Sequence, residues 1–161
     1  MLVVADTSVL LNLCRVSAEG LLRGLFAEVW VPPAVAAEFL RLAAGRPRFR
    51  GLALPDWVRI SPAVKVPPEV RACADLDAGE SEALSLALEM RASAVLVDEA
   101  AGRSAARMLN VTSIGGAGIL LRAKQRGLIP AVRPLLTQLH EEAGFWLSPV
   151  FESEVLRLAG E

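Results

Sequence analysis

Short apolar runs alternate with longer amphipathic stretches along the chain. Two of the runs, Leu2–Ala5 and Ala94–Val97, contain no polar residue, which predicts strands buried on both faces of a parallel sheet. Shorter runs predict further strands at 29–31, 57–60 and 111–114. The stretches between them predict helices at 9–16, 19–26, 34–43, 68–74, 79–91, 99–109, 116–126, 130–142 and 149–158. Strands that alternate with helices predict one α/β domain over residues 1–161, in three α/β/α layers around a parallel sheet of four to five strands.

Each of the two fully apolar strands runs directly into an aspartate. Asp6 follows Leu2–Ala5, and Asp98 follows Ala94–Val97. The carboxyl ends of strands in an open α/β sheet form the edge where ligands bind. Either aspartate alone is equally well explained as a helix cap. The pair, at the ends of two buried strands, favours a shared acidic pocket.

Two glutamates are placed near the sheet by helical periodicity. Glu38 lies at the edge of an apolar stripe on the helix at 34–43, where it is either a site residue or a glutamate at the rim of the core. Glu80 lies on the apolar side of the helix at 79–91 and in its first turn, where the helix dipole stabilises an anion. Glu82 is predicted to face solvent. Glu99 either joins the acids or pairs with Arg103 four residues on, and we slightly favour the ion pair.

The composition changes the picture in two ways. Apolar residues make up 53% of the chain, more than is usual, so we expect a covered apolar surface and therefore a homodimer. The formal net charge of −1 excludes a basic protein that coats nucleic acid, although bound divalent metal would cancel several acids.

The histidine and cysteine content limits the kinds of metal site, and the length of the apolar runs bears on the cellular location of the protein. His140 is the only histidine, and Cys14 and Cys73 lack metal-ligand spacing, so a histidine-rich zinc site cannot form and the cysteines are expected to be reduced. No apolar run approaches the roughly 18 residues of a membrane span, and the start lacks a basic signal-peptide region. We therefore expect a cytoplasmic protein without membrane contact.

The four acids resemble the pattern of a PIN domain in order and spacing. The resemblance covers about the first 145 residues, and Glu80 and Asp98 stand eighteen apart, as the last two acids commonly do in VapC-type toxins. The chain is also similar to a prokaryotic PIN-like group of predicted nucleic-acid-binding proteins. One departure is Glu80 itself, where the toxins usually have Asp. The matching motifs are Asp6-Thr-Ser-Val-Leu-Leu, Pro32-Pro-Ala-Val with Glu38, Gly79-Glu-Ser-Glu-Ala, Val97-Asp-Glu with Arg103, and Gly118-Ile-Leu-Leu-Arg-Ala-Lys.

The resemblance implies a metal-dependent ribonuclease with RNA as substrate. Because converging carboxylates repel one another, they are expected to bind Mg²⁺ or Mn²⁺. The catalytic and metal-binding residues it implies are Asp6, Glu38, Glu80 and Asp98. Thr7 or Ser8 would orient bound water or phosphate. Residues that either contact the RNA backbone or are ordinary surface charges are Arg46, Arg48, Arg50 and Arg103. If the protein acts as a toxin, as the resemblance to VapC-type toxins implies, an antitoxin protein is expected as its binding partner.

Two functions of other classes remain open from the sequence. One is a non-catalytic nucleic-acid-binding or regulatory module that keeps the acids as a metal or partner site. The other is a small-molecule phosphohydrolase, which would favour an Asp-x-Asp motif, but Ser8 stands where the second aspartate would be. Phe49, among the loop arginines, either stacks on a base or plugs the core.

Overall fold

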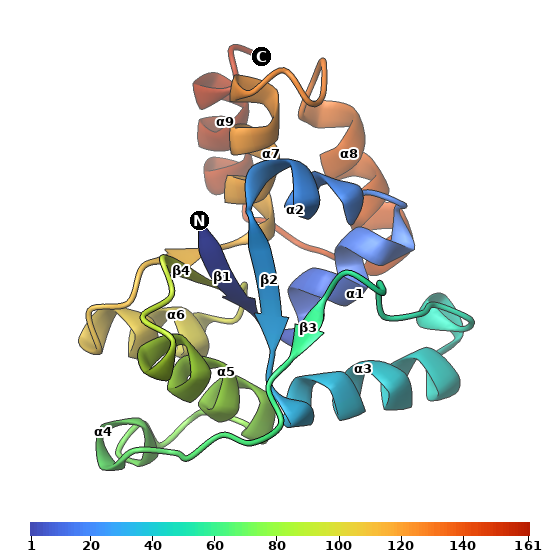
Figure 1. The fold of residues 1–161 in the computed structure, drawn as a ribbon. Coiled ribbons are helices and arrows are strands. Elements are labelled where there is room, and N and C mark those ends of the chain that lie inside the picture. The colour runs from blue at the N-terminus through green and yellow to red at the C-terminus, as the bar shows by residue number, and fades with distance from the viewer.

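The computed structural model describes residues 1–161 and has a five-stranded, all-parallel sheet at its centre (Figure 1). The strand order is β3-β2-β1-β4-β5. The predicted α/β class and parallel sheet are confirmed. The strands are β1 (Leu2–Ala5), β2 (Glu28–Val31), β3 (Arg59–Ile60), β4 (Ala94–Leu96) and β5 (Ser113–Ile114).

The helices follow the predicted alternation closely. They are α1 (Thr7–Arg15), α2 (Gly20–Leu25), α3 (Pro33–Gly45), α4 (Pro68–Arg71), α5 (Ala78–Glu89), α6 (Ala100–Met108), α7 (Gly116–Gln125), α8 (Arg133–Gln138) and α9 (Pro149–Leu158), with a 3₁₀ turn η1 (Pro47–Phe49) and a π-helical turn η2 (Leu139–Ala143). The helix expected at 130–142 begins at Arg133, runs from α8 directly into the π-helical turn η2, and ends where Gly144 adopts a left-handed φ of 72°. The helix expected at 68–74 and the strand expected at 57–60 are shorter than predicted.

The helices cover both faces of the sheet. Right-handed crossovers from β1 through β2 to β3 place α1 to α3 on one face, and the return through β4 to β5 places α4 to α6 on the other. Among the helices, α1 contacts α3, α7 contacts α2 and α3 also contacts α5, while α5 packs on β1 and β4. The chain therefore leaves β1 and β4 towards opposite faces, and ligands bind at such a switch point.

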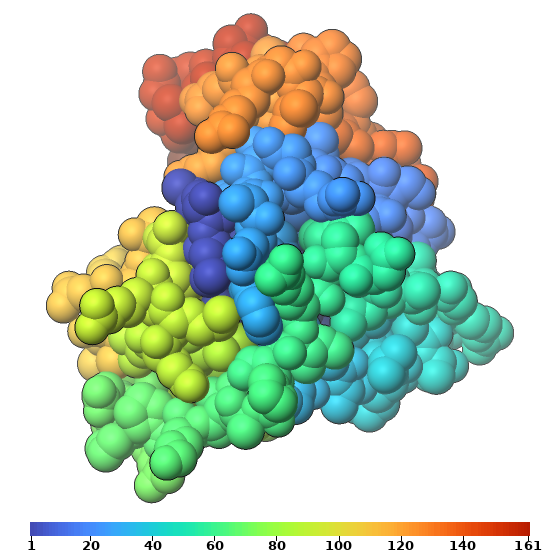
Figure 2. All heavy atoms as spheres, in the orientation of Figure 1, coloured from blue at the N-terminus to red at the C-terminus, as the bar shows by residue number.

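The centre of the core is β1, which lies between β2 and β4. Val3, Val4 and Ala5 have no exposed surface, as predicted for a strand buried on both faces. In the space-filling view the dark blue N-terminal residues lie between later segments, and the orange and red C-terminal segments gather at one end (Figure 2). None of the helices combines the length and the apolar character that a membrane-spanning segment needs.

Candidate functional site

Asp6 occupies the carboxyl end of β1 and is almost fully buried. Its backbone N–H donates to the Leu96 carbonyl at 2.9 Å, which fixes the residue beside the end of β4. Only 4% of its surface is exposed. Burial raises the pKa of the Asp6 carboxyl to about 7, a backbone hydrogen bond from Thr7 opposes this, and the charges of Asp77, Glu80 and Glu38 add to it. Asp6 is therefore a carboxyl group that titrates close to neutrality.

Thr7 joins the end of β1 to α3. Its Oγ1 donates a hydrogen bond of 2.8 Å to Glu38 Oε2, and Thr7 is 3% exposed. Glu38 is half-buried, which agrees with the position predicted at the edge of the apolar stripe. The threonine therefore orients a neighbouring carboxylate.

Glu80 lies in the first turn of α5 and is held by Asp77. Asp77 Oδ1 accepts from the Glu80 N–H at 2.7 Å, and Glu80 Oε2 accepts from the Asp77 N–H at 3.1 Å, which is a complete capping box. Glu80 is 5% exposed, so its predicted direction towards the core is confirmed, and burial raises its pKa. Sequence reasoning missed Asp77, although the Asp77-x-x-Glu80 spacing of a capping box was readable.

Carboxylate oxygens from three elements converge on Gly79. A Cβ at this position would lie 3.0 Å from Glu38 Oε2, 3.4 Å from Asp77 Oδ1 and 3.5 Å from Asp6 Oδ1. A side chain at position 79 would press against the Glu38 carboxylate and would touch the other two at ordinary van der Waals distance. Glycine therefore leaves room for the Glu38 carboxylate beside the first turn of α5.

Asp98 and Glu99 follow β4 and point differently. Asp98 Oδ1 accepts from the Gly116 N–H at 2.7 Å and so caps α7. Burial raises the pKa of Asp98, while the Gly116 hydrogen bond and the Arg103 charge lower it. Glu99 is exposed and forms no ion pair with Arg103, so that slightly favoured interpretation was wrong. Its charge instead acts on Glu80 and raises the pKa of that residue.

These side chains line two adjoining pockets at the carboxyl edge of the sheet. The acidic pocket, of about 610 Å³, is lined by Asp6, Glu38, Asp75, Asp77, Glu80 and Glu99, together with Thr7, Ser8, Arg46 and Arg48. The adjoining pocket, of about 460 Å³, contains Asp98, Arg103, Phe145, Trp146 and Phe151. The two share Ser8, Asn12, Glu99 and Gly144. Three of the four predicted acids thus lie in one pocket, and Asp98 lies in its neighbour.

The sequence comparison bears on this arrangement directly, because a PIN domain family model matches residues 2–161. The chain belongs to the PIN domain family. PIN domains are commonly nucleases and typically bind Mg²⁺ or Mn²⁺. A comparison with the curated proteins finds no match.

The arginines of this PIN domain differ in their access to the two pockets. Arg46 and Arg48 line the acidic pocket, and Arg48 Nη1 donates to the Ala143 carbonyl at 3.0 Å. Arg103 lines the adjoining pocket, whereas Arg50 is exposed and lines neither. Phe49 is 6% exposed and part of the core, so it plugs the core and is not available for base stacking.

Ser8 carries the one unsatisfied group at the site. Its Oγ is buried and has no hydrogen-bond partner within the protein. A buried hydroxyl without a partner is costly, which favours a ligand or water that completes it. Ser8 lines both pockets as a residue, and a partner of its hydroxyl would have to reach the buried oxygen from one of them.

Glu82 is not the solvated surface residue that periodicity predicted. It is half-buried, and its Oε2 accepts from the Ala34 N–H at 3.0 Å. The helix α3 begins at Pro33 after Pro32, and neither proline can provide a side-chain cap. The carboxylate of Glu82, reaching across from α5, satisfies one of the free N–H groups of α3 instead.

The acidic pocket fits a hard divalent cation in donor chemistry. Its ligating atoms are carboxylate oxygens, which Mg²⁺ and Mn²⁺ prefer. No group of three or more Asp, Glu, His or Cys side chains is arranged so that it could hold a metal ion. Asp77 and Glu80 are each engaged with the other's backbone N–H, so water would supply part of the coordination. The residues that would hold a cation are Asp6, Glu38 and Glu80, with Asp77 and Glu99 beside them.

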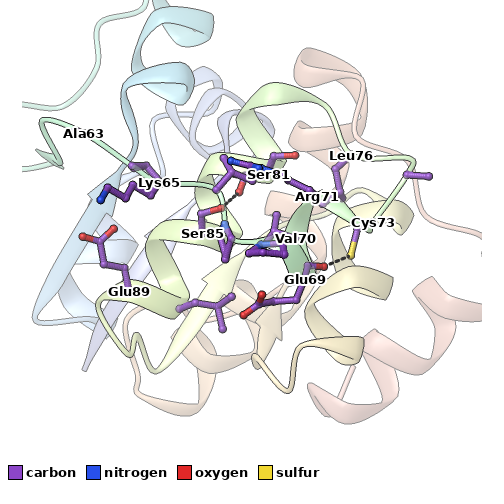
Figure 3. Close-up of a pocket in the computed structure, with 16 residues that line it drawn as sticks. Ala63, Lys65, Glu69, Val70, Arg71, Cys73, Leu76, Ser81, Ser85 and Glu89 are labelled. Carbon is purple, nitrogen blue, oxygen red and sulfur yellow. Dashed lines mark hydrogen bonds between the residues drawn. The ribbon is translucent and has the colours of Figure 1, made fainter.

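The largest cavity of the molecule is elsewhere and lacks this chemistry. It has a volume of about 1520 Å³ and lies between α5 and the segment that contains α4 (Figure 3). Its polar groups are satisfied locally, since Ser85 Oγ donates to the Ser81 carbonyl and Cys73 Sγ to the Glu69 carbonyl. Its charged lining residues, such as Lys65 and Glu69, are of both signs and exposed. Size alone therefore does not identify the functional site.

Proposed function

We propose that this PIN domain is a Mg²⁺- or Mn²⁺-dependent endoribonuclease. The observation that carries the proposal is the acidic pocket, in which carboxylates from the end of β1, from α3 and from α5 meet at the switch point of the sheet. Arginines line the same pocket and suit a polyanionic substrate. The family membership supports nuclease chemistry in general.

The reaction would be hydrolysis of a phosphodiester. A water oxygen forms a bond to phosphorus while the bond to the 3′-oxygen breaks, which leaves a 5′-phosphate and a 3′-hydroxyl. A bound divalent cation supplies Lewis acidity and lowers the pKa of water. Carboxylates of the acidic pocket would hold the cation, with Asp6, Glu38 and Glu80 as ligands or as groups that position water. Asp98, expected from the sequence to be a principal ligand, lies in the adjoining pocket and would act on the substrate side of the site. Because the pKa of metal-free Asp6 is about 7, Asp6 would bind a cation best above neutrality.

Other residues would act on the substrate and on the ligands. Thr7 holds Glu38 through its hydroxyl, and the unpaired hydroxyl of Ser8 would donate to a phosphate oxygen or to water. Arg46, Arg48 and Arg103 would offset the charge of the RNA backbone. In this proposal Glu99 is an outer carboxylate of the acidic pocket.

A cleavage assay with end-group analysis tests the proposal. Mixed RNAs are incubated with the wild-type protein in Mn²⁺ or in EDTA, and with the Asp6→Asn variant. The expected result is cleavage only by wild type in Mn²⁺, with 5′-phosphate and 3′-hydroxyl ends. Asp56→Asn is the matched control, because Asp56 is exposed and lines neither pocket, and it should cleave as wild type does.

Two outcomes would contradict the proposal. Cleavage that persists in EDTA or in Asp6→Asn would come from another nuclease or another site. Products with 2′,3′-cyclic phosphate ends would show attack by the 2′-hydroxyl of the RNA rather than by water.

A further inference from the structure

Two aromatic side chains stand exposed beside the acidic pocket. Trp146 is 68% exposed and Phe151 45% exposed, and both line the adjoining pocket. We call this pair the aromatic rim. Large aromatic side chains are costly to leave in water, so an exposed pair at the mouth of a pocket indicates a binding surface.

The aromatic rim is held in place by the segment around it. Phe145, next to Trp146, is half-buried, and its N–H donates to the Leu139 carbonyl at 3.0 Å. Its ring packs against Gly116, where an added Cβ would lie 3.5 Å from the ring. On the other side, Ser148 Oγ accepts from the Phe151 N–H at 3.2 Å and caps α9. The backbone that carries the two exposed rings is therefore anchored on both sides.

The surroundings of the aromatic rim favour a nucleotide over a protein partner. The same pocket contains Asp98, Glu99 and Arg103 with the polar side chains of Ser8 and Asn12. The core of a protein–protein interface is depleted of charged residues, whereas a nucleotide presents a flat apolar base joined to charged and hydroxyl groups. Arg103 is exposed in this pocket and suits a phosphate.

The acidic pocket and the adjoining pocket are connected, which indicates how an RNA strand would lie across them. They share Ser8, Asn12, Glu99 and Gly144, so a strand bound in the acidic pocket would continue into the pocket that carries the aromatic rim. We propose that Trp146 and Phe151 form a stacking subsite for an unpaired nucleobase beside the phosphate that reacts. The inference rests on the proposed nuclease function and assigns its substrate preference to two residues. Only an unpaired base can offer its face to these rings, because a duplex keeps its bases stacked.

Fluorescence of Trp146 tests binding without requiring cleavage. Trp30→Phe and Trp57→Phe leave Trp146 as the only tryptophan, and Asp6→Asn keeps the RNA intact in Mn²⁺. A single-stranded oligoribonucleotide should quench the emission. A duplex of equal length, or an abasic strand with the same phosphates, should quench little. Equal quenching by the abasic strand would overturn the proposal, because it would show contact with phosphate alone.

Kinetics of the otherwise wild-type protein provide the second test. Stacking is worth about 1–3 kcal/mol per base, so Trp146→Ala should raise KM for single-stranded RNA roughly 5- to 150-fold with little change in kcat. Trp146→Phe should retain most of the affinity. Met108→Ala is the control, because Met108 is 74% exposed on α6 and lines neither pocket, and it should behave as wild type.

The outcomes separate this inference from the proposed function. Cleavage by Trp146→Ala with an unchanged KM would overturn the stacking subsite and leave the nuclease intact. Selective quenching by single strands without cleavage by the wild type would support the subsite and refute the nuclease. Conversion of a dimer into a monomer by Trp146→Ala would overturn the subsite, because the rim would then be a protein interface.

Discussion

At the scale of single residues, the acidic pocket is defined by how its carboxyl groups are held. Asp6 is buried at a strand end, Glu38 accepts from Thr7, and Glu80 shares a capping box with Asp77. The positions of Asp6, Glu38 and Glu80 were predictable from the sequence. The apolar run before Asp6 places it at the end of a strand, and helical periodicity gives the side of the helix on which Glu38 and Glu80 lie. The Asp98 contact was not, because it depends on where the Gly116 N–H lies in space.

Asp6 should make the metal-free protein less stable as the pH rises. The pKa of its carboxyl is about 7 in the folded protein, above the ordinary 3.8, so between these values only the folded state keeps the proton. The contribution of the protonated Asp6 carboxyl to the free energy of unfolding is therefore fully present below about pH 4 and is lost by about pH 7. At ~1.4 kcal/mol per unit of pKa difference, the loss is on the order of a few kcal/mol.

Urea unfolding in EDTA at pH 5 and pH 8 measures this effect. Wild type should lose more free energy of unfolding between the two pH values than Asp6→Asn, and the variant should be the more stable protein at pH 8. The same pH dependence in both proteins would show that Asp6 is not a protonated buried carboxyl.

At the scale of elements, α3 depends on a cap that belongs to another helix. Periodicity placed Glu82 in solvent because it considers one helix at a time, and the acceptor that α3 needs cannot be read from α5 alone. Pro32 and Pro33 at the start of α3 were the available signal that its cap comes from elsewhere. The change from α-helix to π-helix between α8 and η2 was likewise hidden, because the chain stays helical through both segments.

Glu82→Ala should destabilise the protein by about 1 kcal/mol, the usual cost of a lost helix cap. Glu82→Gln should cost less, because its amide oxygen can still accept from the Ala34 N–H. Chemical denaturation measures both, with Glu89→Ala as control on an exposed position of the same helix, where a change stays within about 0.5 kcal/mol. Equal stability of Glu82→Ala and Glu89→Ala would show that the cap contributes nothing.

At the scale of the whole molecule, the sheet and its helices followed from the sequence more fully than the site did. Apolar runs specify which strands are buried, and right-handed crossovers then leave few topologies. The division of the acids between two adjoining pockets depends on loop directions after β1 and β4, which carry no periodic signal. The aromatic rim could not be predicted either, because only the folded chain brings Trp146 and the first turn of α9 to the carboxyl edge of the sheet.

The apolar surplus still predicts a homodimer formed through helices. Exposed apolar side chains on helices include Leu40 on α3 and Leu158 on α9. Light scattering at micromolar concentration should give twice the mass of one chain. Ile60→Lys, on the exposed edge strand β3, should leave that mass unchanged. A monomeric mass for the wild type would contradict the predicted dimer. A dimeric wild type with a monomeric Ile60→Lys variant would indicate pairing through the edge strand β3.

Calorimetric titration with Mn²⁺ at pH 8 tests the central claim, that the acidic pocket is a divalent metal site, most directly. Wild type should bind Mn²⁺, and Asp6→Asn and Glu80→Gln should bind it at least tenfold more weakly, a loss of about 1.4 kcal/mol. Asp56→Asn and Glu89→Gln, which remove exposed acids outside the acidic pocket, should bind as wild type does. Absence of binding by wild type, or equal affinity in all five proteins, would contradict the account.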